Sequence, residues 1–204
     1  MKTRLALLLL LGRIVGAQID ESLLGSLSNK KAVSILESER SNGRVGGAWD
    51  FRVTNTDRSF NYKLRATPIS ARVATALAHL LVNAKGIQPS EARATVSSLL
   101  EGGYYYLMIE LDPREGSGVI PSDWTARLGN EKNSESGHIC EKLPDTGPWA
   151  QIIRAFPRDY AYDAFLVRVA RVDGGKPIIT SGLPVELRVH IENKSGTVRW
   201  NTPF

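Results

Sequence analysis

The residues best suited to chemistry lie together in the stretch Ser136–Lys142, which reads SGHICEK. His138 and Cys140 are two positions apart, and Glu141 follows directly. Residues i and i+2 of an extended strand point to the same side, so the imidazole and the thiol can face one ligand. These two groups serve as base and nucleophile in hydrolases and as ligands of zinc. His138, Cys140 and Glu141 are therefore the candidate catalytic residues.

The same stretch is poor in metal ligands. A closed zinc site needs four ligands, usually two close pairs, and only one pair is present. Asp159 and Asp163 bracket two tyrosines, but they lack the dense spacing of acidic residues found in calcium loops. The sequence also contains no nucleophile elbow, metalloprotease motif or glycine-rich phosphate loop. We predict no metal and no cofactor, and we favour binding over catalysis.

Aromatic and basic side chains form a second group of candidates. Several arginines and lysines occupy alternate positions of predicted strands, and tyrosines lie near them. Basic residues beside partly exposed tyrosines suit the recognition of an anionic glycan or an acidic protein partner. The candidate binding residues are Tyr104, Tyr106, Tyr160, Tyr162 and Arg188.

The first 17 residues have the layout of a secretory signal peptide. Lys2 and Arg4 precede the apolar run Leu5–Leu11, and Val15 and Ala17 occupy the −3 and −1 positions of a cleavage site. We predict removal of residues 1–17 and a secreted or periplasmic product. No later stretch approaches the ~20 apolar residues of a transmembrane helix.

Charge and cysteine content limit the class of partner. The chain has 26 basic and 21 acidic residues, and residues 1–17 contain three of the basic and none of the acidic ones. The remainder would carry 23 basic and 21 acidic residues, a net charge of only +2, which does not predict nucleic-acid binding. The single cysteine, Cys140, excludes an intramolecular disulfide.

Hydrophobic periodicity predicts the elements that position these residues. Alternating patterns indicate strands, and 3.6-residue stripes indicate an inserted pair of amphipathic helices at about 70–101, with Ser70 as N-cap and Gly86 as C-terminal stop. The predicted strands cover residues 49–54, 60–66, 104–111, 165–170, 185–191 and 197–200.

This order of elements predicts an α+β fold, with a mostly antiparallel β-sheet or β-sandwich into which the helical pair is inserted. We expect a flexible lead-in at 18–44 and a single globular domain at 45–204, with a long loop region at 112–148.

Three functions fit these patterns. The first is an exported, non-catalytic binding or interaction protein with a protein or glycan partner. The second is a small exported hydrolase that uses the His138/Cys140 loop. The third is an envelope assembly or scaffold subunit that docks through its helical pair.

Overall fold

The computed structural model describes residues 19, 21–47, 61–113, 119–130, 137–157 and 159–204. The predicted signal peptide and the predicted strand at 49–54 lie outside these residues. The helices are α1 (Glu21–Ser26), α2 (Asn29–Ser38), α3 (Ala71–Lys85), α4 (Pro89–Glu101) and α5 (Gly147–Ala155). The strands are β1 (Ser41–Val45), β2 (Tyr62–Pro68), β3 (Tyr104–Asp112), β4 (Thr125–Asn130), β5 (His138–Ile139), β6 (Glu141–Lys142), β7 (Asp163–Ala170), β8 (Val172–Asp173), β9 (Lys176–Pro177), β10 (Val185–Ile191) and β11 (Lys194–Trp200).

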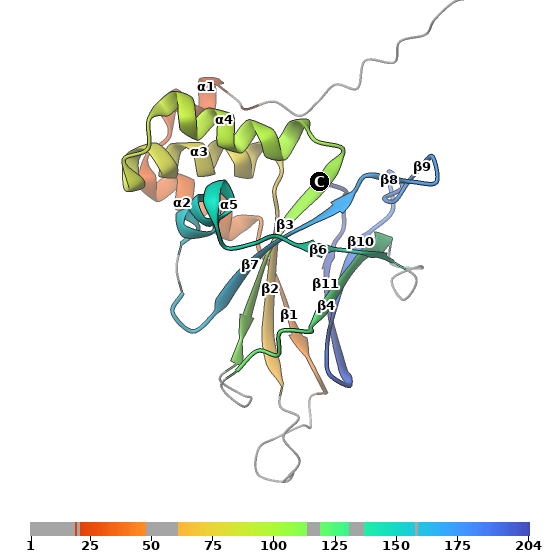
Figure 1. The fold of residues 1–204 in the computed structure, drawn as a ribbon. Helices are drawn as coiled ribbons and strands as arrows, with labels where there is room; N and C mark the ends of the chain where they lie inside the picture. The colour runs from red at the N-terminus through yellow and green to blue at the C-terminus, as the bar shows by residue number, and fades with distance from the viewer. Residues whose placement is uncertain (1–18, 20, 48–60, 114–118, 131–136, 158) are drawn as a thin grey trace, which may run out of the picture.

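Nine of these strands form one antiparallel sheet in the order β5-β4-β10-β11-β1-β2-β3-β7-β6, and β8 and β9 form a separate small hairpin. The helices gather on one side of the sheet (Figure 1). This arrangement confirms the predicted α+β class, with its mostly antiparallel sheet and its helical pair.

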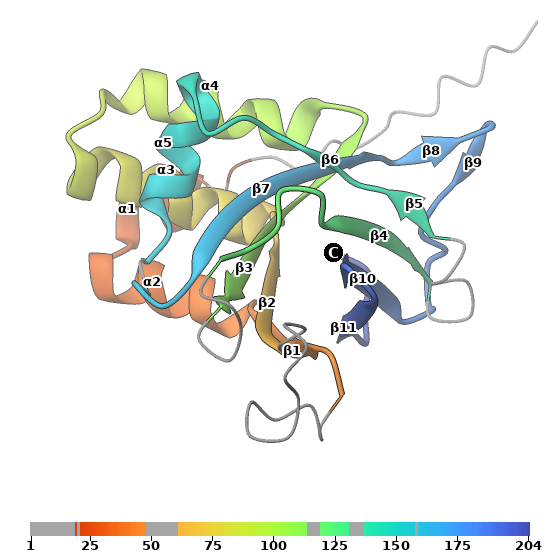
Figure 2. The same cartoon turned by 60° about the horizontal axis from the view of Figure 1, so that its bottom comes forward.

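The sheet curls until its two edges nearly meet (Figure 2). The edge strands β5 and β6 are consecutive in the chain, separated only by Cys140. The Cys140 amide donates a hydrogen bond to the Ala126 carbonyl beside β5, and the Leu143 amide donates one to the Leu166 carbonyl of β7. Residues 138–142 therefore bridge the two ends of the sheet and give it a barrel-like form.

The inside of the curled sheet holds one of two hydrophobic cores. Alternate residues of each strand point inward, as in Val185, Leu187 and Val189 of β10, and all three are fully buried. Trp124 lies in the same core and packs edge-on against Phe165, with ring centroids 5.1 Å apart. The inward faces predicted from alternation at 62–66, 105–111 and 185–191 are the faces that line this core.

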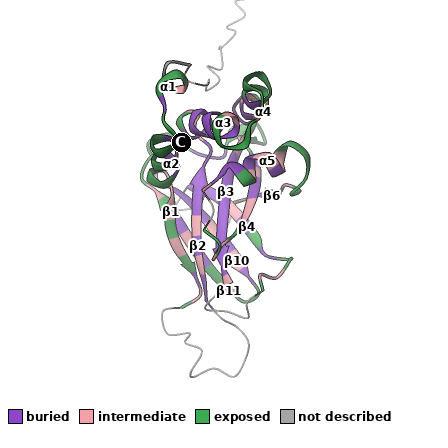
Figure 3. Ribbon diagram, turned by 90° about the vertical axis from the view of Figure 1, so that its left-hand side faces the viewer, coloured by how far each residue is buried: buried purple, intermediate pink, exposed green. Residues whose placement is uncertain are grey.

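The second core lies between the outer face of the sheet and the helices. Met108 of β3 and Leu166 of β7 are fully buried and share one cluster with residues of the helices. Figure 3 shows the buried part of β3 directly below α3. The predicted stripe of α4, made of Ala92, Val96, Leu99 and Leu100, is buried as expected.

The ends of α3 follow the predicted capping residues. The Ser70 side chain accepts a hydrogen bond from the Val73 amide at 3.3 Å. Gly86 ends the helix in the left-handed region at φ 68°, where the absence of a Cβ removes the steric cost.

Two stretches contain more structure than we expected. The expected lead-in at 18–44 contains α1, α2 and most of β1, and α2 buries Ala32, Ile35 and Leu36 against the other helices. The expected loop at 112–148 contains β4, β5 and β6 and the first residues of α5. Short elements of this kind have weak local signals because long-range packing supplies most of their stability.

Candidate functional site

The structure separates the three candidate catalytic residues. Cys140 points into the inner core and is buried, and this burial raises the pKa of its thiol to about 12. His138 instead places Nδ1 3.2 Å from the Asp173 carboxylate in the β8–β9 hairpin. Glu141 lies on the outer face and binds Arg168 through two contacts of 2.7 and 3.1 Å. At neutral pH the arrangement holds a neutral, enclosed thiol rather than a thiolate nucleophile.

His138 and Asp173 line a cavity of about 280 Å³ beside the β8–β9 hairpin. Asn130 also lines it, and its side chain bonds to the backbone of Thr180 and Pro184. Within the described part of the chain, no group of three or more His, Cys, Asp or Glu side chains is placed to hold a metal ion.

Two of the predicted binding residues are less accessible than we expected. Tyr106 is buried, because α5 covers this end of β3 and Trp149 stacks on the tyrosine ring at 5.9 Å. Arg188 is only partly exposed and places Nη2 3.2 Å from the buried carboxylate of Glu186. Tyr104 is accessible, with 36% of its surface exposed.

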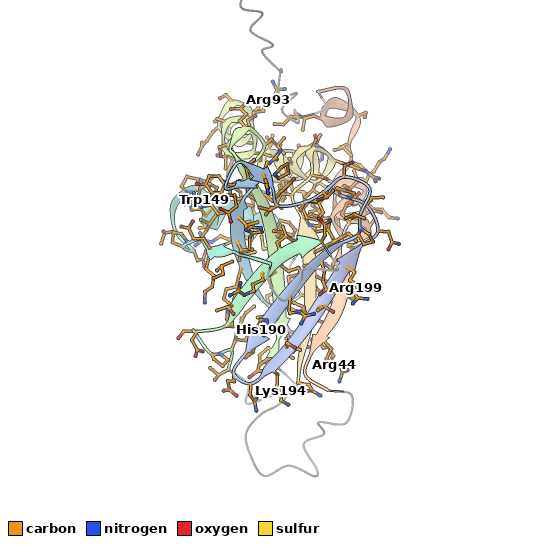
Figure 4. All side chains as sticks on the ribbon, turned by 90° about the vertical axis from the view of Figure 1, so that its right-hand side faces the viewer. Arg44, Arg93, Trp149, His190, Lys194 and Arg199 are labelled. Carbon is orange, nitrogen blue, oxygen red and sulfur yellow. The ribbon has the colours of Figure 1, made fainter. Side chains whose placement is uncertain are left out.

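Basic residues gather on the outer face away from the helices. Arg44, His190 and Arg199 come from β1, β10 and β11, and Figure 4 shows them on the same side of the molecule. Arg199 binds Glu186 through Nε at 2.7 Å. The buried carboxylate of Glu186 therefore neutralises part of the positive charge on this face.

The other two candidate binding tyrosines, Tyr160 and Tyr162, lie together in one cavity. This cavity, the α5–β7 groove, has a volume of about 480 Å³ and lies where α5 and its connection to β7 meet β3. Tyr160 is 91% exposed at this place, and Tyr162 is half-buried. The lining residues are Glu110, Asp145, Ile153, Phe156, Pro157, Asp159, Tyr160, Tyr162, Asp163, Ala164 and Phe165.

Glu110 is the buried polar group of the α5–β7 groove. It lies on the outer face of β3 opposite Ala164 and is only 3% exposed. Its Oε2 forms an ion pair with Arg40, whose Nε is 2.9 Å away. Burial raises the pKa of the Glu110 carboxyl, although the charges of Arg40 and Arg65 oppose this rise.

Arg65 crosses from β2 into the same region. Its Cζ lies 3.9 Å from the centroid of the Tyr162 ring, and its Nη1 is 3.1 Å from the Asp159 carboxylate. Asp159 is held in a turn, in which its Oδ1 accepts from the Ala161 amide and its carbonyl accepts from the Tyr162 amide. A guanidinium is therefore held between a carboxylate and an aromatic face.

Sequence reasoning identified part of this groove. Tyr160 and Tyr162 were binding candidates, and Asp159 and Asp163 were noted beside them. Glu110 was missed as a site residue. Its position in the sequence could have indicated a role, because Glu110 is the only charged residue in the apolar stretch Tyr104–Leu111. In the structure it lies on the face of β3 that does not line the inner core.

Comparisons of the chain with family models, curated proteins and solved structures found no match. Among the helices that the structure describes, none combines the length and apolar character required to cross a membrane.

Proposed function

We propose that the protein is an exported, non-catalytic binding protein that holds part of a protein or glycan partner in the α5–β7 groove. The observation that carries this proposal is the combination of a 480 Å³ groove, an exposed Tyr160 and a buried Glu110 in one place. Binding sites typically combine concave aromatic surfaces with a few polar groups that fix the ligand's orientation.

The placement of the other candidates supports binding over the two alternatives. A hydrolase that uses Cys140 needs an accessible thiolate, whereas this thiol is buried and has a pKa of about 12. A scaffold that docks through its helical pair needs an exposed apolar stripe on α3 or α4. The predicted α4 stripe and most of the α3 stripe are instead packed within the outer core.

Export is part of the proposal and rests on the residues of the segment 1–17. N-terminal sequencing of the protein recovered outside the cytoplasm tests it, and we expect Gln18 as the first residue. Recovery only from the cytoplasmic fraction, with residues 1–17 still attached, would contradict export.

Chemical-shift mapping by NMR locates the binding surface, whichever class of ligand the protein prefers. The isotope-labelled protein is titrated with neutral oligosaccharides, acidic peptides and basic peptides. We expect at least one class to shift the resonances of Glu110, Tyr160 and Tyr162. Tyr160→Ala should then weaken binding about tenfold, since an exposed aromatic anchor is lost, whereas Tyr104→Ala should leave it within twofold. Shifts confined to another surface, or equal effects of the two substitutions, would overturn the proposal.

A further inference from the structure

We propose that the α5–β7 groove binds an extended peptide segment of a protein partner, and that this segment pairs as an added strand with the open edge of β7 at residues 163–165. This inference rests on the proposed function and specifies the partner and its mode of binding. Three observations carry it. The β6–β7 ladder ends before these residues, the backbone of Ala164 faces the uncovered side, and the groove contacts all three residues.

The strand β6 covers only part of one side of β7. On the other side, β7 pairs with β3 along its full length. The ladder with β6 contains Val167 and Arg168. One further hydrogen bond joins the Leu143 amide to the Leu166 carbonyl, and the chain then leads to α5. Within the described part of the chain, residues 163–165 therefore have a strand partner on the β3 side only.

The backbone N–H and C=O groups of Ala164 face the uncovered side of β7. In an antiparallel ladder, a residue directs both groups to the same neighbouring strand, and the next residue directs its groups to the other one. The Leu166 carbonyl faces β6, because it accepts from the Leu143 amide, so the groups of Ala164 point the same way. Neither group forms a hydrogen bond with another described residue. A strand edge with an unused donor and acceptor is a template for strand addition.

The groove runs along this edge. Asp163, Ala164 and Phe165 all line it, although alternate side chains of a strand point to opposite faces. A cavity that contacts three consecutive strand residues therefore reaches the edge of the strand and not only one face. At about 3.4 Å per residue the uncovered stretch is about 10 Å long, so it can pair with about three residues of an extended peptide.

Apolar and aromatic side chains beside the edge provide contacts for the side chains of such a peptide. Ile153 in the last turn of α5 and Phe156 at its C-cap line the groove, as does Tyr160, which is 91% exposed. In strand addition, main-chain hydrogen bonds give affinity, and contacts with every second side chain give specificity. A glycan has no regular series of amide groups with which to pair, so this edge favours a peptide.

A neutral pentapeptide, acetyl-Thr-Val-Thr-Val-Thr-amide, tests the pairing without relying on charge. One derivative is N-methylated at both valines, and the other is N-methylated at the second and third threonines. Since successive residues direct their N–H groups to opposite edges, only one derivative loses its donors to β7. In calorimetric titrations we expect that derivative to bind about tenfold or more weakly than the parent peptide, and the other to stay within about threefold. Equal affinities of the two derivatives would overturn strand addition.

Hydrogen exchange locates the pairing in the protein. The bound peptide should slow exchange of the Ala164 amide about tenfold or more, because the amide gains a hydrogen bond. The amide of Ala170 points to the same side of β7 outside the groove, and its exchange should not change. Protection of Ala164 in concentrated protein without peptide would identify a second copy of this chain as the occupant and would overturn the peptide.

A matched pair of substitutions removes the donor at each of these positions. Ala164→Pro removes an N–H that points away from β3, and it should weaken peptide binding about tenfold. Ala170→Pro makes the same change outside the groove and should leave the affinity within about twofold. The N-methylated peptides and the exchange measurement use the parent protein, so they decide the question even if Ala164→Pro does not fold.

The outcomes separate this inference from the proposed function. Groove shifts with oligosaccharides but with none of the peptides would overturn strand addition and leave the binding function intact. The same conclusion would follow if a peptide bound in the groove without protecting the Ala164 amide. Absence of groove shifts with every ligand class would instead remove the proposed function itself.

Discussion

The guanidinium of Arg65 lies over the ring of Tyr162, with Cζ 3.9 Å from the ring centroid. The two residues are far apart in the sequence and meet because β2 and β7 both pair with β3. The contact places a positive charge against a phenol that Asp112, Asp159 and Glu110 surround with negative charge. Burial and these acids raise the pKa of Tyr162, and Arg65 is the group that opposes the rise.

Arg65→Met should therefore raise the pKa of Tyr162 further, because the phenolate loses the positive charge that opposes the rise. The measurement is a pH titration of the protein labelled with ¹³Cζ-tyrosine, which resolves each ring by NMR. Arg171→Met is the matched control, since Arg171 lies over the ring of Tyr105 and not of Tyr162. A Tyr162 pKa that is unchanged or lowered by Arg65→Met would contradict the electrostatic role of Arg65.

Glu110 should make folding stability fall as pH rises above its ordinary pKa of 4.5. Its pKa is raised in the folded state, so the folded protein binds more protons than the unfolded chain between the two values. Its contribution is thus fully present below pH 4.5 and is lost as pH rises through the raised value. Denaturant unfolding of the parent and Glu110→Gln from pH 4 to 7 measures this, and the parent should lose stability relative to the variant. A parent that gains relative stability over this range would refute the assignment.

Cys140 should be almost inert to thiol reagents in the native protein. With a pKa of about 12, its thiolate fraction at pH 8 is about 1,000-fold below that of an ordinary thiol, and the core also blocks access. The rate of labelling by iodoacetamide is compared between the native protein and the protein in denaturant. Native labelling within tenfold of the denatured rate would show that the segment 138–142 opens readily.

Glu186→Gln should lower the free energy of unfolding by about 3 kcal/mol, because it removes the charge that balances Arg188 and Arg199. Glu186 is 0% exposed although it lies on the outer face of β10. Glu141→Gln breaks an exposed pair with Arg168 and should cost less than about 1 kcal/mol. Both values come from denaturant unfolding at neutral pH, and similar costs for the two variants would argue against a special role of the buried acid.

Gly196→Ala should disturb the pairing of β11 with β1 and lower stability by about 3 kcal/mol. A Cβ at this position would overlap the backbone carbonyl of Arg44, and Gly196 is the residue opposite Val45 in the ladder. Gly103→Ala introduces the same methyl group where no atom lies within 4 Å, and it should change stability by about 0.5 kcal/mol or less. Thermal unfolding of the two variants gives the comparison, and equal melting temperatures would exclude a tight approach of β1 to β11.

The sequence by itself determined the local elements and the face that each one buries. The alternation of Val185–Ile191 identified the inward side of β10, and Ser70 and Gly86 marked the ends of α3. These features depend on the side-chain period of a strand or helix and on capping within one turn, both of which are local. The α+β class followed from the order of the elements.

Tertiary structure alone decided how the sheet closes and which polar groups meet. The bridge formed by 138–142 depends on β4 and β7, which lie on opposite sides of it in the sequence and at opposite ends of the sheet order. The α5–β7 groove likewise brings Glu110 from β3 together with Asp159 and Tyr160 from the connection after α5. A local sequence pattern does not predict which of these residues contact one another. The register across the sheet and the burial of a charge both depend on packing between segments that are distant in the sequence. The same packing made Cys140 a core residue and moved the candidate site from SGHICEK to the groove.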